Sequence, residues 1–235
     1  ERRSALLIAP TGAGKTLAGF LPSLVELGGA PRVFSTSRSV ARSSGLHTLY
    51  ISPLKALAVD IARNLQAPIE EMGLSIKVET RTGDTPASRK QRQRRYPPDI
   101  LLTTPEQLAL LLSSDDAPYL FSSLKRVVLD ELHALVTSKR GDLLSLGLAR
   151  LWRIAPELRM IGLSATVAEP EQLARFLVPQ PAGRAEAADV VIASGAAQPI
   201  VQMLDTRERL PWAGHSARHA LAEMYELIKA NKTTL

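Results

Sequence analysis

The sequence predicts an α/β fold in which helices flank both faces of a mostly parallel β-sheet. Short apolar runs rich in β-prone residues alternate along the chain with longer segments of helical periodicity, as is typical of strand–helix–strand units. The length of 235 residues suffices for one large domain, or for one domain and part of another. Hydrophobic residues make up 45% of the chain and charged residues 22%, so the composition excludes a disordered or fibrous class.

Seven short runs are predicted to be strands because β-prone apolar residues fill them and polar or turn-forming residues bound them. Their ranges are 5–9, 46–52, 75–80, 100–103, 126–130, 160–164 and 190–193. Strands separated by helices pair in parallel, because a crossover helix returns the chain to the same end of the sheet. We therefore expect a sheet whose strands all end at one edge.

Helical periodicity is clearest in three segments. Apolar side chains recur at helical spacing over residues 54–72, so this helix is expected to lay one apolar stripe on the sheet and to end at Gly73. Thr104, Pro105 and Gln107 form a capping-box pattern with proline at the first helical position, so a helix is expected to begin there. A last amphipathic helix is expected over residues 217–228. Between these segments, residues 28–45 are expected to form a mobile insertion and residues 178–188 a surface connection.

Composition also narrows the chemistry. The chain has no cysteine, which excludes disulfides, thiolate metal sites and thiol nucleophiles and suits a reducing compartment, so we expect a cytoplasmic protein. Its four histidines are too scattered in the sequence for a convincing metal cluster. No apolar run approaches the roughly 18 residues of a membrane span. A formal net charge of +6 allows an anionic partner but is weak evidence for one.

A glycine-rich segment between the first predicted strand and the first helix has the context of a phosphate-binding loop. It reads Ala-Pro-Thr-Gly-Ala-Gly-Lys-Thr over residues 9–16, with alanine where the general pattern begins with glycine. Its glycines let backbone N–H groups close around phosphate oxygens, and the helix N-terminus adds its positive dipole end. The candidate nucleotide-binding residues are Thr11, Gly12, Ala13, Gly14, Lys15 and Thr16. Lys15 is expected to reach the β/γ-phosphates and Thr16 to ligate Mg²⁺.

Two acidic residues, Asp130 and Glu131, close the apolar run at 127–129. Carboxylates at the carboxyl end of a buried strand project into the crevice where open α/β sheets bind ligands. Alone, such a pair is more often the first turn of a helix. With the phosphate loop upstream, it favours Asp130 as a second Mg²⁺ ligand and Glu131 as the base that polarises the attacking water.

The tripeptide Ser164-Ala165-Thr166 ends another apolar run in the same way. The hydroxyls of Ser164 and Thr166 are candidates to hydrogen-bond His133 or an acidic neighbour, and so to couple the nucleotide site to movement elsewhere. By itself the tripeptide is more typical of a helix cap before Pro170. Both interpretations stay open.

The ordered set of motifs resembles the first RecA-like lobe of a superfamily 2 helicase. Besides the phosphate loop, Asp-Glu-Leu-His at 130–133 and the Ser-Ala-Thr tripeptide, it contains Ser-Pro-Leu-Lys-Ala-Leu at 52–57, Thr-Gly-Asp at 82–84 and Thr-Thr-Pro-Glu at 103–106. The residues of these motifs are most similar to those of the DExH-box group of large helicase-related (Lhr) proteins, particularly the ligase-associated DNA helicases. The resemblance covers roughly residues 4–178.

The resemblance implies ATP-driven translocation along single-stranded nucleic acid, with ATP and Mg²⁺ as cofactors, DNA favoured over RNA, and a role in DNA repair. Lys15, Thr16 and Asp130 would hold Mg-ATP, Glu131 would activate water, and His133 would couple the site to the strand. The residues implied to contact the strand are Ser52, Pro53, Lys55, Thr82, Gly83, Thr103, Thr104 and Pro105. Phosphate contacts of this kind give affinity without reading bases.

The same resemblance implies a domain plan. Residues 1–200 would form the RecA-like ATP-binding lobe, and residues 201–235 a connector toward a second RecA-like lobe of the same longer chain. The arginine finger and the adenine-recognising segment of such helicases have no counterpart here. A transition-state charge of that kind is worth about 10³–10⁵ in rate, so this chain alone is expected to hydrolyse ATP poorly.

Three other functions share part of this pattern. A DExH RNA helicase is the nearest, because both nucleic acids share the backbone that this lobe contacts. A non-motor ATP-binding switch is disfavoured because a binding module could dispense with Glu131. A small-molecule kinase has no use for the segments at 103–106 and 164–166.

A basic run over residues 89–95 includes Arg92, Arg94 and Arg95. Such a run is more often a solvated face than a binding site. Its place just after Thr-Gly-Asp, on the side expected to bind the strand, makes it a candidate to contact the phosphates of incoming duplex.

Overall fold

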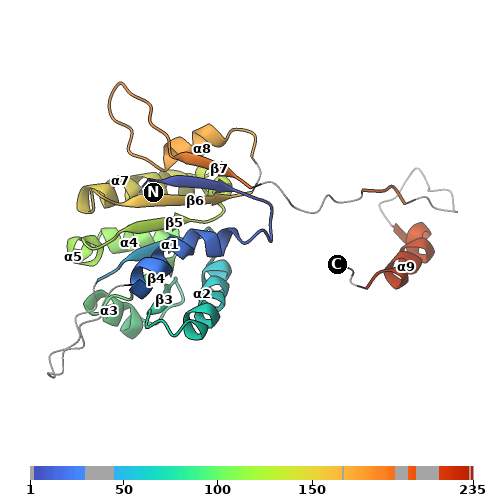
Figure 1. Ribbon diagram of the computed structural model, residues 1–235, viewed down its shortest axis with the longest axis horizontal. Helices are drawn as coiled ribbons and strands as arrows, with labels where there is room; N and C mark the ends of the chain where they lie inside the picture. The colour runs from blue at the N-terminus through green and yellow to red at the C-terminus, as the bar shows by residue number, and fades with distance from the viewer. Residues whose placement is uncertain are drawn as a thin grey trace. The chain divides into compact units, whose positions relative to one another are not determined.

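The computed structural model describes residues 3–29, 45–165, 167–193, 201–204, 217–232 and 234. The chain divides into two compact units, Glu1–Gly195 and Ala196–Leu235. In the second unit the described residues form a 3-10 turn, Ala217–Ala220, and helix α9, Leu221–Ala230, so the predicted C-terminal helix is confirmed. All the elements that follow belong to the first unit (Figure 1).

The sheet of the first unit has seven strands among the described residues, and every pairing in it is parallel. The strands are β1 (Ala5–Ile8), β2 (Thr48–Ile51), β3 (Val78–Arg81), β4 (Ile100–Thr103), β5 (Arg126–Leu129), β6 (Arg159–Ser164) and β7 (Asp189–Ile192). Their spatial order is β3-β4-β2-β5-β6-β1-β7. The predicted α/β class and all seven predicted strands are confirmed.

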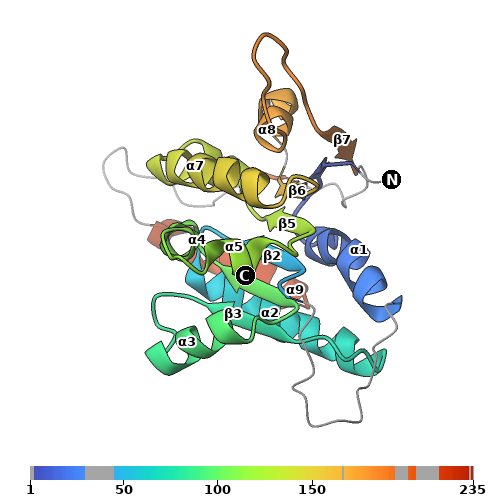
Figure 2. The same ribbon diagram turned by 90° about the vertical axis from the view of Figure 1, so that its left-hand side faces the viewer.

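Helices cover the two faces of the sheet in two groups (Figure 2). One face carries α1 (Lys15–Gly29) and α2 (Lys55–Glu71). The other carries α4 (Pro105–Leu112), α5 (Ala117–Phe121), α6 (Leu132–Val136), α7 (Lys139–Ile154) and α8 (Pro170–Phe176). Helix α3 (Ala87–Arg95) follows edge strand β3.

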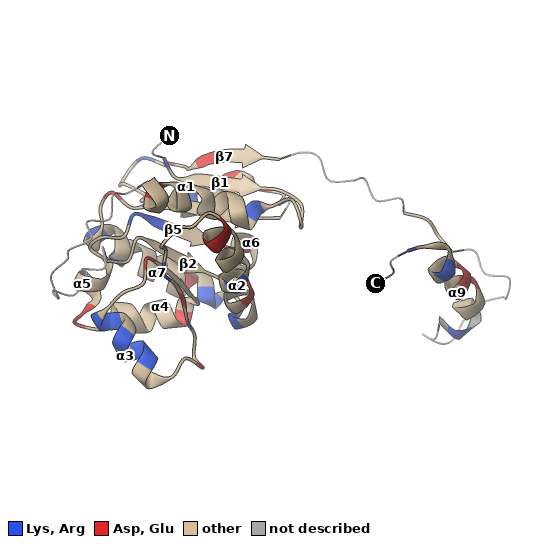
Figure 3. Cartoon of the chain, turned by 60° about the horizontal axis from the view of Figure 1, so that its bottom comes forward, with Lys and Arg blue, Asp and Glu red and all other residues tan. Residues whose placement is uncertain are grey.

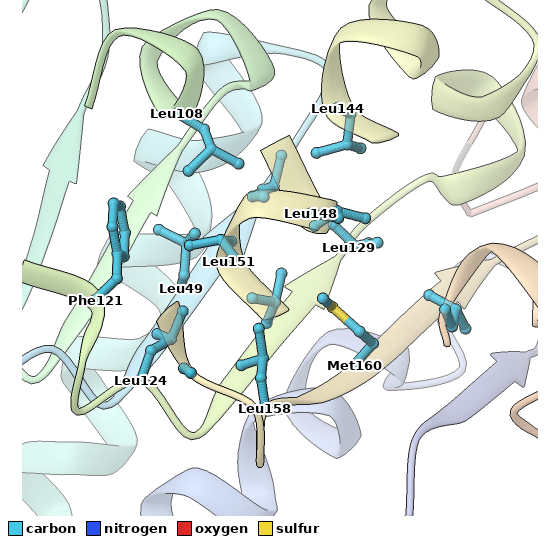
Figure 4. Close-up of a cluster of buried hydrophobic side chains, with 14 of the residues drawn as sticks. Leu49, Leu108, Phe121, Leu124, Leu129, Leu144, Leu148, Leu151, Leu158 and Met160 are labelled. Atoms are coloured by element: carbon cyan, nitrogen blue, oxygen red, sulfur yellow. The ribbon is translucent and has the colours of Figure 1, made fainter. Parts of the chain in front are cut away.

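Alternate side chains of each strand face opposite layers, which gives the first unit two apolar clusters. In β5, Val128 packs under α1 and α2, whereas Val127 and Leu129 join the cluster beneath α4–α8. Figure 4 shows this second cluster, where Leu144, Leu148 and Leu151 of helix α7 meet residues from the strands and from α4 and α5. The strands are therefore buried from both sides, as near-continuous apolar runs predict.

Three local expectations need correction. Gly28 and Gly29 belong to α1, so the predicted insertion cannot begin at residue 28; residues 30–44 lie outside the described residues. Helix α4 does begin at Pro105, but the Thr104 side chain makes no capping hydrogen bond, because it interacts with the Glu106 side chain instead. The predicted strand 75–80 starts later, at Val78, and runs on to Arg81, where it meets Thr103 in β4.

Parallel pairing brings the polar residues that follow the strands to one edge of the sheet. Backbone hydrogen bonds continue the pairing past the strand ends: the Ala9 amide donates to the Ser164 carbonyl at 3.2 Å and the Asp130 amide to the Ile51 carbonyl at 2.9 Å. The Ser52 amide likewise donates to the Thr103 carbonyl at 3.1 Å. The segments after β1, β6, β5, β2 and β4 are thereby held in a fixed row.

Leu148→Ala should cost about 2–5 kcal/mol of unfolding free energy, because it opens a cavity in the cluster of Figure 4. The matched control is Leu146→Ala in the same helix, where 69% of the side chain is exposed, and its cost should stay within about 0.5 kcal/mol. Urea denaturation of the two variants gives the comparison. Equal losses would show that α7 does not pack as described.

Candidate nucleotide and nucleic-acid sites

The phosphate loop occupies the turn between β1 and α1. Gly12 and Gly14 have φ angles of +82° and +76°, a region that costs side-chain-bearing residues energy and glycine little. The turn is closed by the Ala13 amide, which donates to the Pro10 carbonyl at 3.2 Å. Thr11, Gly12, Ala13 and Gly14 are all exposed, so this loop and the start of α1 present backbone to a ligand at the carboxyl edge.

The ammonium group of Lys15 lies inside this loop. Its Nζ donates to the Ala9 carbonyl at 2.6 Å and to the Pro10 carbonyl at 2.9 Å, and the residue is 9% exposed. Neutral carbonyls hold the group without cancelling its charge. Lys15 is therefore a positioned cation beside the loop, and the half-buried Thr16 follows it in the first turn of α1.

Asp130 is held by two donors at the end of β5. The Tyr50 hydroxyl donates to its Oδ2, and the Glu131 amide donates to its Oδ1 at 2.9 Å. Burial, and then the Asp130 carboxylate, raise the pKa of Tyr50 far above its usual value, so the phenol remains a donor. Phe20 stacks on the Tyr50 ring with centroids 5.3 Å apart. The buried Asp130 carboxylate thus has a set orientation.

Glu131 adopts a left-handed backbone conformation, with φ 47° and ψ 45°. It is the single non-glycine residue with positive φ in the described part of the chain, and such a conformation costs of the order of 1–3 kcal/mol. The turn aims the Glu131 carboxylate back at His133, whose Nε2 lies 3.4 Å from Glu131 Oε2.

His133 also reaches the end of β6. Its Nδ1 and the Ser164 Oγ are 2.9 Å apart, the contact that the sequence suggested for this serine. Ser164 is the last residue of β6, and the N-cap of the next helix is Glu169, so the helix-cap interpretation does not hold for Ser164. Thr166 lies outside the described residues. A chain of contacts therefore runs from Glu131 through His133 to Ser164.

The residues implied to contact a nucleic-acid strand gather at the ends of β2, β4 and β3, which are neighbours in the sheet. Lys55 and Gly83 are exposed and Pro53 is half-buried. The other five are buried: Ser52, Thr82, Thr103, Thr104 and Pro105. Two of the hydroxyls are used internally, since Ser52 Oγ accepts from the Leu54 amide at 3.3 Å and Thr103 Oγ1 donates to the Arg81 carbonyl at 2.8 Å. These two side chains shape the edge rather than face solvent.

The basic run forms helix α3, where the Lys and Arg positions are coloured blue in Figure 3. Gln93 anchors the helix: it is buried, and its Nε2 donates to Glu79 Oε2 at 2.9 Å and to the Thr80 carbonyl at 3.0 Å. Arg92 pairs with Glu79 at 2.7 Å, and Arg94 lies 4.0 Å from an Asp116 carboxylate oxygen. Arg95 lies over the Tyr96 ring, 5.7 Å from its centroid. Arg92 is therefore already paired with a carboxylate, Arg94 lies at the limit of ion-pair distance, and Arg95 contacts an aromatic ring.

This geometry agrees with what comparison of the sequence with protein families finds. Residues 1–174 match the model of the DEAD/DEAH box helicase family. The chain belongs to this family. Its loop, its Asp-Glu pair and its His133–Ser164 contact lie along the row of strand ends β1, β6 and β5.

Among relatives of this helicase-family chain, the Lhr helicase/probable uracil glycosylase of Mycolicibacterium smegmatis is 46% identical over 189 residues, or 75% of this chain and 12% of the relative. The ATP-dependent helicase Lhr-Core of Methanocaldococcus jannaschii is 45% identical over 188 residues, or 76% of this chain and 21% of the relative. The predicted resemblance to Lhr proteins is confirmed. The chain spans about an eighth to a fifth of the length of these relatives.

Two solved helicase structures share the fold. The Mycobacterium smegmatis helicase Lhr bound to ssDNA and AMP-PNP matches with a TM-score of 0.71 and 36% identity, covering 98% of this chain and 29% of that one. The DUF1998 helicase MrfA bound to DNA matches with a TM-score of 0.62 and 31% identity, covering 81% of this chain and 25% of that one. The expected RecA-like lobe of a helicase is thereby confirmed as the fold.

Two observations concern other classes of site. Within the described ranges, no three His, Asp or Glu side chains are grouped so as to hold a metal ion by themselves. Among the helices described, none has the length and apolar character needed to cross a membrane.

Tyr50 is the residue of the candidate nucleotide site that sequence reasoning missed. It sits inside an apolar strand, where a tyrosine has the appearance of core, and only the adjacency of β2 and β5 brings its hydroxyl to Asp130. A tyrosine near the end of a buried strand was the available signal, because a buried phenol needs a hydrogen-bond partner.

Tyr50→Phe should raise the Mg²⁺ concentration needed for half-maximal nucleotide binding by about 10-fold, because partners that orient a ligating carboxylate are typically worth 10–100-fold in metal affinity. Phenylalanine keeps the stacking on Phe20 and removes only the donor. A Mg²⁺ titration with a fluorescent ATP analogue measures the effect, with Tyr119→Phe, at an exposed position, as control. An unchanged Mg²⁺ requirement would contradict the role given to Tyr50.

Proposed function

We propose that this chain is the ATP-binding lobe of an ATP-dependent DNA helicase or translocase, which couples Mg-ATP hydrolysis to movement along single-stranded DNA. The observation that carries the proposal is the contact chain Glu131–His133–Ser164 beside the phosphate loop. With Lys15 and Asp130, this contact chain gives one site a cation, two carboxylates and a polar link to strand β6. A module that only binds ATP has no need of the base or of the link.

In this mechanism the phosphate loop and Lys15 bind the triphosphate through backbone N–H groups and one ammonium. The hydroxyl of Thr16 and the carboxylate of Asp130 are hard oxygen donors, the kind that Mg²⁺ prefers. Each Asp130 oxygen accepts one hydrogen bond and keeps a lone pair, so the donor set fits the ion. An ion held by these two residues would supply positive charge against the charge that develops on the phosphates.

Glu131 is the proposed general base, positioned to take a proton from the attacking water. Its strained turn holds the carboxylate next to His133 Nε2, so a change in charge at Glu131 changes its electrostatic interaction with the imidazole. His133 passes that change to Ser164 at the end of β6. These residues together supply the coupling that a motor requires.

Single-stranded DNA is the proposed track. Two structure neighbours above 30% identity are bound to ssDNA or to DNA, which supports DNA over RNA. Residues 1–200 are the proposed lobe and residues 201–235 the proposed connector to a second RecA-like lobe, in line with the greater length of the relatives. The proposed compartment is the cytoplasm, the expectation from a sequence that uses no cysteine.

ATP turnover of the chain extended through its second lobe should rise on addition of single-stranded DNA. Glu131→Gln should abolish it, since a general base contributes about 10²–10⁴-fold. The chain of residues 1–235 alone is the matched reference and should turn over far more slowly, because the second lobe supplies the missing transition-state charge.

Stimulation by RNA but not DNA would favour the RNA helicase instead. ATP binding without an effect of either strand on turnover would contradict the motor and leave a switch module. Brisk turnover by residues 1–235 alone would contradict the need for a second lobe.

Helix α3 has its own test. Replacing Arg92, Arg94 and Arg95 together by Ala should flatten the salt dependence of DNA binding, because each phosphate contact contributes about 0.7–0.9 to the log–log slope. Arg92→Ala alone should change the slope least, since Glu79 already pairs with that arginine. The control is Arg184→Ala, whose side chain is 80% exposed in the segment after α8. A slope equal to that of the control would leave α3 as a solvated face.

A further inference from the structure

Arg140 joins two of the segments proposed to contact DNA, although no motif includes it. It is the second residue of α7. Its Nη1 donates to the Pro53 carbonyl at 2.7 Å, after β2, and its Nη2 donates to Glu106 Oε2 at 3.1 Å, in the first turn of α4. Nε donates to the other Glu106 oxygen, Oε1. One planar guanidinium thus sets the separation of both segments.

The backbone of α7 is tied to the nucleotide site by a close approach at the next residue. A Cβ on Gly141 would lie 2.4 Å from the Leu135 carbonyl oxygen and 2.9 Å from that of Val136, so the start of α7 contacts the last turn of α6 directly. The Gly141 amide donates to the Ser138 carbonyl at 2.7 Å, which keeps the connecting turn tight. Helix α6 begins one residue after Glu131 and contains His133.

These contacts form an unbroken route between the two sites. It runs from Ser164 and Glu131 through His133 into α6, across Gly141 into α7, and from Arg140 to Pro53 and Glu106. Contiguous packed contacts of this kind can carry coupling between sites.

We propose that Arg140 is a positioning residue that holds the Pro53 and Glu106 segments in the spacing that engages DNA, and links that spacing to the Glu131–His133 turn. The inference rests on the proposed function. In this role Arg140 contacts neither the nucleotide nor the DNA strand, and acts through the Pro53 and Glu106 segments.

The exposure of the Arg140–Glu106 ion pair indicates that it positions the two segments and adds little to the stability of the fold. The Arg140 and Glu106 side chains are 38% and 47% exposed, and ion pairs as exposed as this add little to stability. Burial raises the pKa of Glu106, but hydrogen bonds from Arg140, the backbone and Thr104, together with the Arg140 charge, outweigh it and lower that pKa. The carboxylate therefore stays charged at neutral pH and keeps both Arg140 contacts.

In the chain extended through its second lobe, Arg140→Ala should reduce the DNA-stimulated kcat for ATP by about 10-fold, within the 5–150-fold range of typical coupling between sites. Basal turnover and the KM for ATP should stay within about 2-fold, because Arg140 has no contact with the nucleotide residues. The matched control is Arg126→Ala at the start of β5, which removes another arginine–glutamate pair, to Glu26 of α1, and should keep full stimulation.

Two further variants test the geometry. Arg140→Lys should recover less than half of the stimulation, because one ammonium cannot hold the carbonyl and both carboxylate oxygens as a planar fork does. Glu106→Gln should also lower stimulation, and the double variant with Arg140→Ala should lose no more than the worse single variant. This pair keeps the test decisive should Arg140→Ala fold poorly.

Each outcome decides the matter. Stimulation by DNA in Arg140→Ala equal to that in Arg126→Ala, an equal fall in basal and stimulated turnover, full rescue by Arg140→Lys, or additive losses in the double variant would overturn the inference alone. An unmodified protein that single-stranded DNA does not stimulate would overturn the proposed function, and the inference with it.

Discussion

The proposed sites depend on the parallel pairing of β5 between β2 and β6. This pairing brings the carboxyl ends of the three strands to one edge, where Ser52 follows β2, Asp130 follows β5 and Ser164 ends β6. The apolar runs are buried on both faces, so this register is costly to shift, because a slip of one residue would move every side chain of the strand into the opposite packed layer. The polar edge is therefore positioned by the apolar core beneath it.

At the middle of that edge, Asp130 follows β5 and is hydrogen-bonded to the neighbouring strand β2. Its amide donates to the Ile51 carbonyl and its Oδ2 accepts from the Tyr50 hydroxyl, both in β2. The next residue, Glu131, holds a strained turn that aims its carboxylate toward His133, on the β6 side. The buried Asp130 carboxylate held in this way has little freedom, as ligands of an ion must. Among the described non-glycine residues, positive φ is confined to Glu131, the proposed general base.

Sequence patterns were sufficient for the type and order of the elements, although not for each boundary or cap. Alternating apolar runs predicted the seven strands, and the loop of residues 9–16 predicted its own turn, because glycine at positions 12 and 14 suits positive φ. Contacts between strands distant in sequence were beyond reach. The bond between Tyr50 and Asp130 requires knowing that β2 lies beside β5, and the anchoring of α3 by Gln93 requires knowing where the helix returns to β3. The inward direction of the Ser52 and Thr103 hydroxyls depends on the turn after each strand, which composition does not specify.

The two proposed sites meet at the β2–β5 boundary. On one side lie β5, β6 and β1 with the nucleotide residues, and on the other lie β2, β4 and β3 with the residues proposed for DNA. Across the boundary, Asp130 contacts Tyr50 and Ile51, and the chain continues from Ile51 into Ser52 and Pro53. A shift of Asp130 on nucleotide binding would therefore reach Pro53 from within the sheet, while Arg140 contacts the same residue from α7. Because both routes converge on Pro53, the segment after β2 is where the state of the nucleotide would be converted into a change in contact with the strand.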